Sequence, residues 1–413
     1  QLFALVVCPT SLMYNWQHEL TKFTPSLTFQ IHHGGSRNKT QLINREVEVI
    51  ITTYGTLRSD IKMFSELAFD YVILDESQAI KNPTSKVTKA ASLLKATNRL
   101  CLSGTPLQNN TFDIYAQMNF LNPGMLGSVE FFKHNFSMPI DKFDEQEQKE
   151  HLRKFVFPFI LRRTKEQVAK DLPEKQEMVL YCEMGDAQRK IYEAYRNDYR
   201  DKLLGMVEEK GLQKSQLSIL QGLMKLRQIC DSPAIIKDET YPNESVKLTE
   251  LTREIVENIG DHKALVFSQF LGMLGLIKEE LTKLGIDFEY FDGSSTIQER
   301  ERAIERFQND PKCRVFLISL KAGGVGLNLT AADYVYIVDP WWNPAVEQQA
   351  IDRTHRIGQT KNIFAYRMIC NDTVEDKILK LQDRKRALAK DLISDEEGFV
   401  KSLTKEDINY LFS

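Results

Sequence analysis

Short and almost fully apolar segments recur along this chain, and each ends at a proline, a glycine or a polar residue. The clearest are LFALVVC, VIITT, YVIL, RLCL, ALVF, RVFLIS and VYIV. Segments of this length and composition are typical of central strands in a parallel sheet, which are covered on both faces. Helix-like stretches separate most of them. The pattern therefore predicts a doubly wound α/β fold.

Length and charge set the outer limits. The chain has 413 residues, of which 27% are charged, and a net charge of −3. This length exceeds one ordinary core and suits two domains. A near-neutral total does not exclude nucleic acid, because a local basic groove decides that binding. No apolar run is long enough to cross a bilayer, and no signal peptide is visible, so no membrane partner is expected.

The cysteines are scattered, and none forms a CxxC pair. This spacing argues against a zinc site and against a disulfide framework. A reducing compartment fits the same observation.

Asp75 and Glu76 follow directly after the predicted strand YVIL. Carboxylates at strand ends of α/β folds lie where ligands bind. Such a pair could hold a divalent cation there. The alternative is a negatively charged helix start, which the two residues alone leave open.

Gln349, Arg353 and Arg356 follow one another at spacings of four and three. On a helix, which we expect here, these spacings place all three side chains on one face. Two arginines one turn apart match the oxygens of a polyphosphate. The alternative is a solvated face that is paired to Asp352 and Glu347.

Taken in order, the motifs resemble those of the Snf2 family of superfamily 2 helicase-like ATPases over essentially the whole chain. The matching segments are PTSLMYNW, TTYGTLR, DESQ, SGTPLQNN, LMKLRQICDSP and residues 319–359. The resemblance implies two RecA-like lobes, each a parallel sheet flanked by helices, with helical protrusions. It places a first lobe, incomplete at its N-terminus, and protrusion 1 at residues 1–173. A linker and protrusion 2 follow at 174–245, the second lobe at 246–370, and a C-terminal helical brace at 371–413.

The resemblance also implies roles for single residues. Asp75, Glu76, Arg353 and Arg356 would form the catalytic centre. The nucleotide would be contacted by Gly324, Gly326 and Gln349. Coupling of ATP hydrolysis to DNA would involve Ser103, Gly104 and Thr105. Contacts to DNA would come from Pro9, Thr10, Thr52, Thr53, Ser268, Gln269, Ser319, Lys321 and Trp342. For Trp342, packing is the alternative interpretation.

The function implied by the resemblance is ATP-dependent movement on double-stranded DNA and remodelling of protein–DNA complexes, with ATP as substrate and Mg²⁺ as cofactor. The ending LTKEDINYLF is similar to bacterial members. We therefore expect a monomer in the bacterial nucleoid, or in the nucleus if the source is eukaryotic, with RNA polymerase or another DNA-bound protein as cargo. Two alternatives stay open: a strand-separating helicase, and a catalytically inactive DNA-binding module.

One family motif is missing from these residues. Residues 33–40, HGGSRNKT, approach the phosphate-binding pattern GxxxxGK[ST], but His33 and Asn38 stand where two glycines are required. In the family that loop precedes the stretch that opens this chain. We therefore expect a longer parent protein, and we expect residues 1–413 alone to bind and hydrolyse ATP poorly.

Several local features are also predicted. Thr10 or Ser11 should cap a helix that carries Trp16. Two long helices should fill residues 186–233 with a loop at Gly211, and residues 175–184 should form a linker strand. Thr404 and Asp407 should start a helix close to a capping box. In the family such a tail braces the second lobe against the first.

Overall fold

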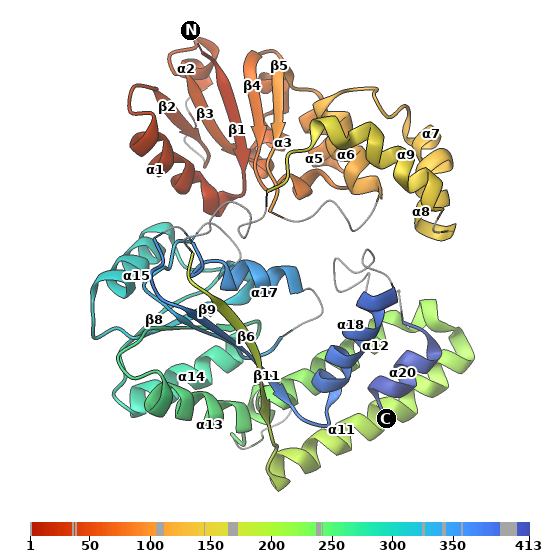
Figure 1. The fold of residues 1–413 in the computed structure, drawn as a ribbon, viewed down its shortest axis with the longest axis vertical. Coiled ribbons are helices and arrows are strands. Elements are labelled where there is room, and N and C mark those ends of the chain that lie inside the picture. Colours follow the sequence, from red (N-terminus) through yellow and green to blue (C-terminus); the bar gives the residue numbers. More distant parts are fainter. Residues whose placement is uncertain are drawn as a thin grey trace. The chain divides into compact units, whose positions relative to one another are not determined.

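The computed structural model describes residues 2–34, 37, 39–104, 111–143, 145–163, 172–236, 241, 243–323, 327–340, 344–356, 358–388 and 403–413. The chain divides into two compact units, residues 1–163 and 164–413. Each unit contains a parallel sheet with helices beside it (Figure 1). The predicted α/β fold with two such lobes is confirmed, while the residue ranges proposed for the four segments stay predictions.

The described strands of the N-terminal unit form one five-stranded sheet in the order β2-β3-β1-β4-β5, and every pair is parallel. The strands are β1 (Ala4–Cys8), β2 (Phe29–His32), β3 (Val49–Thr53), β4 (Ala68–Leu74) and β5 (Lys95–Cys101). Every residue of β1 and β3 is buried, as their apolar sequences predict. The carboxyl ends of all five strands consequently meet at one edge of the sheet.

Short helices connect these strands. They are η1 (Thr10–Leu12), α1 (Met13–Phe23), α2 (Lys39–Ile43), α3 (Tyr54–Ser59), α4 (Ile61–Phe64), η2 (Ser77–Ile80) and α5 (Lys86–Ser92). The predicted cap of the first helix is wrong. A 3₁₀ turn begins after Pro9 and runs directly into α1, and no side chain caps either element. The fixed φ of Pro9 (−57°) already suits the start of the turn.

The remaining helices of this unit are α6 (Thr111–Leu121), α7 (Val129–Phe132), the π-helical η3 (Lys133–Ser137), α8 (Met138–Phe143), α9 (Gln146–Val156) and η4 (Phe157–Phe159). They enclose a small apolar core of their own, which includes Tyr115, Phe132 and Leu152. This part of the chain therefore forms a helical protrusion beside the sheet (Figure 1).

The C-terminal unit contains a six-stranded parallel sheet in the order β6-β11-β10-β7-β9-β8. Its strands are β6 (Lys175–Cys182), β7 (Ala264–Ser268), β8 (Phe288–Phe291), β9 (Val315–Ser319), β10 (Tyr334–Ile337) and β11 (Ile363–Cys370). The linker strand expected at residues 175–184 is thus an edge strand of this sheet, since β6 pairs with β11 along its whole length. Its alternating sequence fits an edge position, where one face is less covered.

Helices cover both faces of this sheet: α13 (Val246–Arg253) with the π-helical η6 (Glu254–Asn258), α14 (Leu271–Lys283), α15 (Ile297–Asn309), α16 (Leu320–Gly323) and α17 (Pro344–Ile351). Successive side chains of β7 consequently enter two different cores. Ala264 and Val266 belong to one core, and Leu265 and Phe267 belong to the other.

Two long antiparallel helices, α11 (Asp186–Lys210) and α12 (Leu212–Asp231), follow β6, as predicted. Gly211 ends α11 with a φ of +76°, which favours glycine at that turn. The short η5 (Pro233–Ile235) then leads back toward the sheet.

The chain closes with α18 (Val374–Leu388) and α20 (Lys405–Leu411), and Thr404 and Asp407 form the predicted capping box at the start of α20. The described contacts of this tail lie in its own unit. Phe412 is buried beside Gly222 of α12, where an added Cβ would lie 3.2 Å from the Phe412 ring. The tail thus packs against α12. No described helix is both long and apolar enough to cross a membrane.

Candidate nucleotide and nucleic-acid sites

Asp75 lies directly after β4, at the carboxyl edge of the N-terminal sheet, and its side chain is held in one orientation. The Trp16 indole Nε1–H donates to Asp75 Oδ2 at 2.8 Å, and the backbone N–H of Glu76 donates to Oδ1 at 2.8 Å. The Tyr54 hydroxyl donates to the Asp75 backbone carbonyl at 2.7 Å. Helix α1 and the turn after β4 therefore hold the carboxylate, while helix α3 contacts only the backbone of the same residue.

Glu76 has a left-handed backbone, with φ 49° and ψ 52°. This conformation is unfavourable for a residue with a Cβ and is concentrated at functional sites. Gln78 Nε2 donates to Glu76 Oε2 at 2.6 Å, and the Ser103 hydroxyl donates to Gln78 Oε1 at 3.1 Å. The predicted catalytic and coupling residues Glu76 and Ser103 are thus joined through Gln78, a link that the sequence did not predict.

The donor set at this edge fits Mg²⁺. Asp75 and Glu76 are half-buried, so both carboxylates can be reached by a ligand. Each oxygen of a carboxylate can accept two bonds, so one hydrogen bond per Asp75 oxygen leaves capacity for a cation. Mg²⁺ prefers oxygen ligands from one or two carboxylates together with substrate phosphates.

The nearby cysteines take no part in such chemistry as thiolates. Burial, followed by the negative charge of Asp75, raises the pKa of Cys8 to about 12. Burial raises the pKa of Cys101 to about 12 as well, against a smaller lowering by a hydrogen bond with Ser77. Both side chains are therefore protonated at neutral pH.

The predicted DNA contacts of the N-terminal unit differ in exposure. Thr10 is exposed, and Pro9 is half-buried beside it. Thr52 is fully buried, and its hydroxyl donates to the His32 carbonyl at 2.8 Å. Thr53 is also buried, and its hydroxyl accepts from the Thr56 N–H at the start of α3. A contact of Thr52 or Thr53 with DNA would thus require these hydroxyls to leave their internal partners. Gly104 is exposed, and Thr105 lies outside the described residues.

The prediction that Gln349, Arg353 and Arg356 share one helix is wrong. Gln349 lies in α17, but this helix ends at Ile351, and both arginines lie in the turns that follow. The Thr354 hydroxyl donates to the Ile351 carbonyl at 2.7 Å, a local bond that competes with continuation of the helix. The Arg353 side chain is only 5% exposed, and Arg356 is half-buried.

Gln359 fixes this turn, and sequence reasoning missed it. Its side-chain amide donates to the carbonyls of Thr330, Ala332 and Thr354 at 2.9–3.1 Å. The backbone carbonyl of Arg353 accepts from Leu329 at 3.1 Å. The segment before β10 therefore holds the arginine-bearing turn in place.

The other predicted residues of this unit lie at neighbouring strand ends. Ser268 of β7 and Ser319 of β9 are partners in register, and both are buried. The Gln269 N–H donates to both carboxylate oxygens of Asp339, at 2.9 and 3.1 Å. Lys321 follows in α16. Gly324, Gly326 and Trp342 lie outside the described residues.

Both halves of the chain match known protein families. Residues 3–235 match the SNF2-related domain, and residues 246–358 match the helicase conserved C-terminal domain. This chain belongs to the SNF2 family. Its two parallel sheets are therefore the two RecA-like lobes of the family's core, and the family's enzymes depend on ATP.

A solved structure supports the same conclusion. The SWI2/SNF2 ATPase core of Sulfolobus solfataricus in complex with dsDNA is 36% identical, with a TM-score of 0.51. The match covers 99% of this chain and 86% of that one.

Curated SNF2 relatives are considerably longer than this chain. An uncharacterized ATP-dependent helicase of Mycoplasma genitalium, MG018, is 37% identical over 99% of this chain and 39% of its own length. The putative ATP-dependent helicase/translocase YwqA of Bacillus subtilis is 36% identical over 99% and 45%, respectively. The TATA-binding protein-associated factor MOT1 of Saccharomyces cerevisiae is 31% identical over 99% and 25%. The chain thus spans less than half of each.

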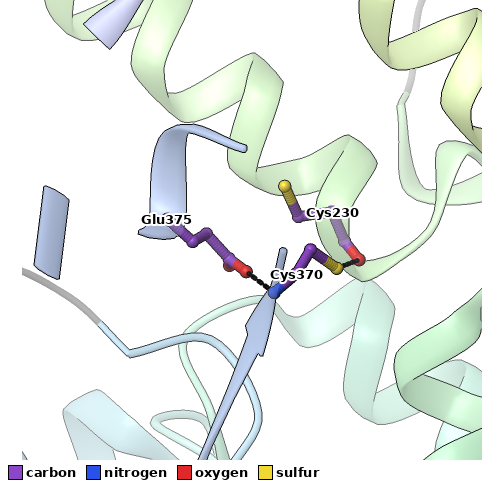
Figure 2. Close-up of side chains that lie close together, drawn as sticks. All are labelled: Cys230, Cys370 and Glu375. Carbon is purple, nitrogen blue, oxygen red and sulfur yellow. Dashed lines mark hydrogen bonds between the residues drawn. The ribbon is translucent and has the colours of Figure 1, made fainter. Parts of the chain in front are cut away.

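The second SNF2 lobe contains a cysteine cluster that the sequence spacing did not reveal. Ligand atoms of Cys230, Cys370 and Glu375 lie within 4.8 Å of one another, because α12 ends beside the end of β11 (Figure 2). Two of these ligand groups, the Cys370 thiol and the Glu375 carboxylate, already have partners. Cys370 Sγ donates to the Cys230 carbonyl at 3.4 Å, and Glu375 accepts from the Cys370 N–H at 3.0 Å. Burial raises the pKa of Cys370, which favours the thiol over the metal-binding thiolate.

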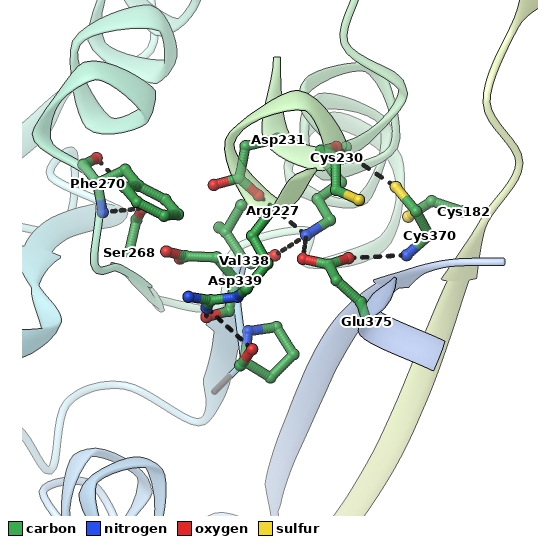
Figure 3. A network of polar contacts seen from close by, with 12 residues as sticks. Cys182, Arg227, Cys230, Asp231, Ser268, Phe270, Val338, Asp339, Cys370 and Glu375 are labelled. Carbon is green, nitrogen blue, oxygen red and sulfur yellow. Dashed lines mark hydrogen bonds and ion pairs between the residues drawn. The ribbon is translucent and has the colours of Figure 1, made fainter. Parts of the chain in front are cut away.

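A group of buried charges, which we call the buried charge network, consists of Arg227, Asp231, Lys247, Asp339 and Glu375. Figure 3 shows Arg227, Asp231, Asp339 and Glu375 beside these cysteines. Lys247 Nζ donates to Glu375 at 2.7 Å, to Asp231 at 2.9 Å and to the Val338 carbonyl at 2.7 Å. Arg227 Nη2 donates to the carbonyls of Asp339 and Pro340 at 2.9 and 3.1 Å. The network therefore ties α12 and α13 to the ends of β10 and β11.

Proposed function

We propose that the protein containing this chain is a DNA-stimulated ATPase that moves on double-stranded DNA and remodels protein–DNA complexes, with Mg²⁺ as cofactor. The proposal rests mainly on the arrangement of the Asp75–Glu76 pair. It lies after β4 of an SNF2 lobe, with one carboxylate held by Trp16 and the other linked to Ser103 through Gln78.

The chemistry follows from these groups. Asp75 would hold Mg²⁺, which, when bound, offsets negative charge on the nucleotide phosphates. Glu76 would orient the attacking water and accept its proton, with Gln78 holding one of its oxygens in place. Arg353 and Arg356 would stabilise the charge of the transferred phosphoryl group, and Gly324, Gly326 and Gln349 would contact the nucleotide.

Changes at the nucleotide would reach DNA through the link from Glu76 to Ser103. That residue begins the Ser103–Thr105 turn, which we propose couples the two sites. Contacts to DNA would come from Pro9, Thr10, Thr52, Thr53, Ser268, Gln269, Ser319, Lys321 and Trp342. Binding mainly through phosphates would make affinity fall steeply with salt.

The partners are proposed from the relatives. One solved relative is in complex with dsDNA, and MOT1 is named as a factor associated with a DNA-bound protein. We therefore propose a DNA-bound protein as the cargo of a monomeric motor, with RNA polymerase as one candidate in a bacterial nucleoid. A strand-separating helicase is the alternative.

The test is phosphate release by the 413-residue chain and by the natural protein that contains it, each with and without duplex DNA. We expect the longer protein to hydrolyse ATP faster when DNA is present. Glu76→Gln should lower turnover by about 100-fold or more, while the matched control Glu66→Gln, an exposed carboxylate of the same unit, should not. Equal turnover in both variants would contradict the proposed site.

Two DNA assays separate movement from strand separation. Displacement of a third strand from a triplex reports movement along an intact duplex, and release of a labelled strand from a duplex reports unwinding. We expect the first and not the second. Duplex binding without turnover in the longer protein would instead indicate an inactive binding module.

A further inference from the structure

We propose that Trp16 is a positioning residue for the Asp75 carboxylate, and that it sets the affinity of the site for its divalent cation. The inference rests on the proposed function of Asp75 as the metal-holding residue. Its basis is the 2.8 Å hydrogen bond from Trp16 Nε1 to Asp75 Oδ2, between residues that lie 59 positions apart in the chain.

The chemistry of this bond is specific. An indole N–H can only donate, so its partner must be an acceptor, and an ionised carboxylate gives a charge-assisted bond. The second Asp75 oxygen accepts from the backbone of Glu76. Rotation of the carboxylate would break both bonds, so the two oxygens keep distinct positions. A cation would therefore meet a ligand whose orientation is already fixed.

Packing alone explains Trp16 poorly. Among the residues of α1, only Met13 is buried. Trp16 itself is only half-buried. An indole that served only to fill space would not need its N–H directed at a carboxylate.

The position of Trp16 also connects two proposed sites. Helix α1 continues directly from the 3₁₀ turn after Pro9, where we propose that the chain contacts DNA. A displacement of α1 would move the indole and, through its hydrogen bond, the carboxylate of Asp75. Trp16 thus joins the helix that follows the segment proposed for DNA to the residue proposed for the metal.

The first measurement is an NMR spectrum of the protein with ¹⁵N-labelled tryptophan. The chain contains three tryptophans, so Trp16→Phe identifies the Trp16 indole signal by its loss. We expect Asp75→Asn to shift this signal, because the charged acceptor is removed. We also expect Mn²⁺ with a non-hydrolysable ATP analogue to broaden it strongly. An unchanged indole signal in Asp75→Asn would overturn the inference.

The second measurement is the Mg²⁺ concentration that gives half-maximal ATP turnover in the natural protein that contains the chain. Trp16→Phe keeps an aromatic ring but loses the donor, and we expect this concentration to rise about 10-fold, as for other residues that orient metal ligands. Tyr54→Phe is the matched control, because it removes a donor to the Asp75 backbone and not to its carboxylate. Its metal dependence should stay close to that of the unaltered protein.

The outcomes separate the two proposals. If the unaltered protein never hydrolyses ATP, the proposed function fails, while the indole signal still decides whether Trp16 holds Asp75. If the unaltered protein is active and Trp16→Phe needs no more Mg²⁺, the inference about Trp16 fails alone. An equal rise in Tyr54→Phe would also overturn it, because loosening around Asp75 would then explain the effect.

Discussion

Carboxylates follow strands in both SNF2 lobes, but their surroundings differ. In the first lobe, the described donors to Asp75 and Glu76 are neutral: an indole, an amide and a backbone N–H. In the second lobe, the carboxylates of the buried charge network face the cations Lys247 and Arg227. A half-buried carboxylate among neutral donors keeps its charge for a cation from outside. A fully buried one with a cation beside it already has its counter-charge inside the protein.

This comparison assigns different roles to the two groups. The Asp75–Glu76 pair can bind a ligand, whereas the buried charge network holds helices and strand ends together. Stability should therefore depend on the second group, and turnover on the first.

The largest effect on stability is expected for Lys247→Met. Lys247 is fully buried, and its loss leaves the carboxylates of Asp231 and Glu375 without their cation. Breaking one partner of a buried ion pair costs about 3–5 kcal/mol. Unfolding in guanidinium chloride, followed by circular dichroism, should show this loss. The control is Lys202→Met, whose ion pair with Asp198 is exposed, and its midpoint should not change. Equal unfolding midpoints for both variants would contradict a structural role of the network.

A smaller, pH-dependent effect is expected for Asp339. Burial raises its pKa from 3.8 to about 6, against opposing contributions from Arg227 and Lys247. Asp231, whose own pKa is raised by burial and by the negative charge of Asp339, lies beside this group, and the N–H of Gln269 donates to it. Between pH 4 and 6 the folded state thus binds more protons than the unfolded state, so this group's contribution to stability falls as pH rises.

Replacement of Asp339 by Asn should remove this dependence. The unfolding free energy of the unaltered protein, relative to that of Asp339→Asn, should fall by on the order of 2 kcal/mol between pH 4 and 7. Asp292→Asn is the control, because hydrogen bonds from Ser294 and Tyr290 lower the pKa of Asp292 to about 2. The unfolding free energy of Asp292→Asn, relative to that of the unaltered protein, should stay nearly constant between pH 4 and 7. If the difference in unfolding free energy between the unaltered protein and Asp339→Asn does not change with pH, the Asp339 carboxyl is ionised throughout this window.

The sequence predicted the sheets well and the site only in part. Runs such as those of β1 and β7 are apolar at every or almost every position, and only a strand covered on both faces buries all of them. The sequence also placed Asp75 and Glu76 directly after a strand, where β4 indeed ends at Leu74, and their catalytic roles stay predictions. It did not predict that α17 ends at Ile351, before the turn that carries Arg353, where a bond from the Thr354 hydroxyl competes with continuation of the helix.

Contacts between distant segments were invisible for a different reason. Trp16 and Asp75, or Lys247 and Glu375, lie far apart in the chain, and only the strand order brings them together. The same applies to Cys230 and Cys370, which looked unrelated in the sequence. Buried charges are the hardest case, because Lys and Glu are ordinarily exposed and their sequence pattern resembles that of a surface.

The smallest effect, and the sharpest test of the comparison, is expected at Glu76. Its left-handed backbone costs stability that a purely structural residue would not need to lose. Glu76→Gly should relieve this cost and be more stable than Glu76→Gln by roughly 0.5–1 kcal/mol, after allowing for the greater freedom of glycine in the unfolded chain. Both variants should lose turnover. Thermal unfolding of the two proteins, with Glu66→Gly as a control at a position without positive φ, gives the measurement. If Glu76→Gly is the less stable of the two, contacts that glycine loses hold the backbone at this position. Glu76 would then have a structural role, as the residues of the buried charge network do.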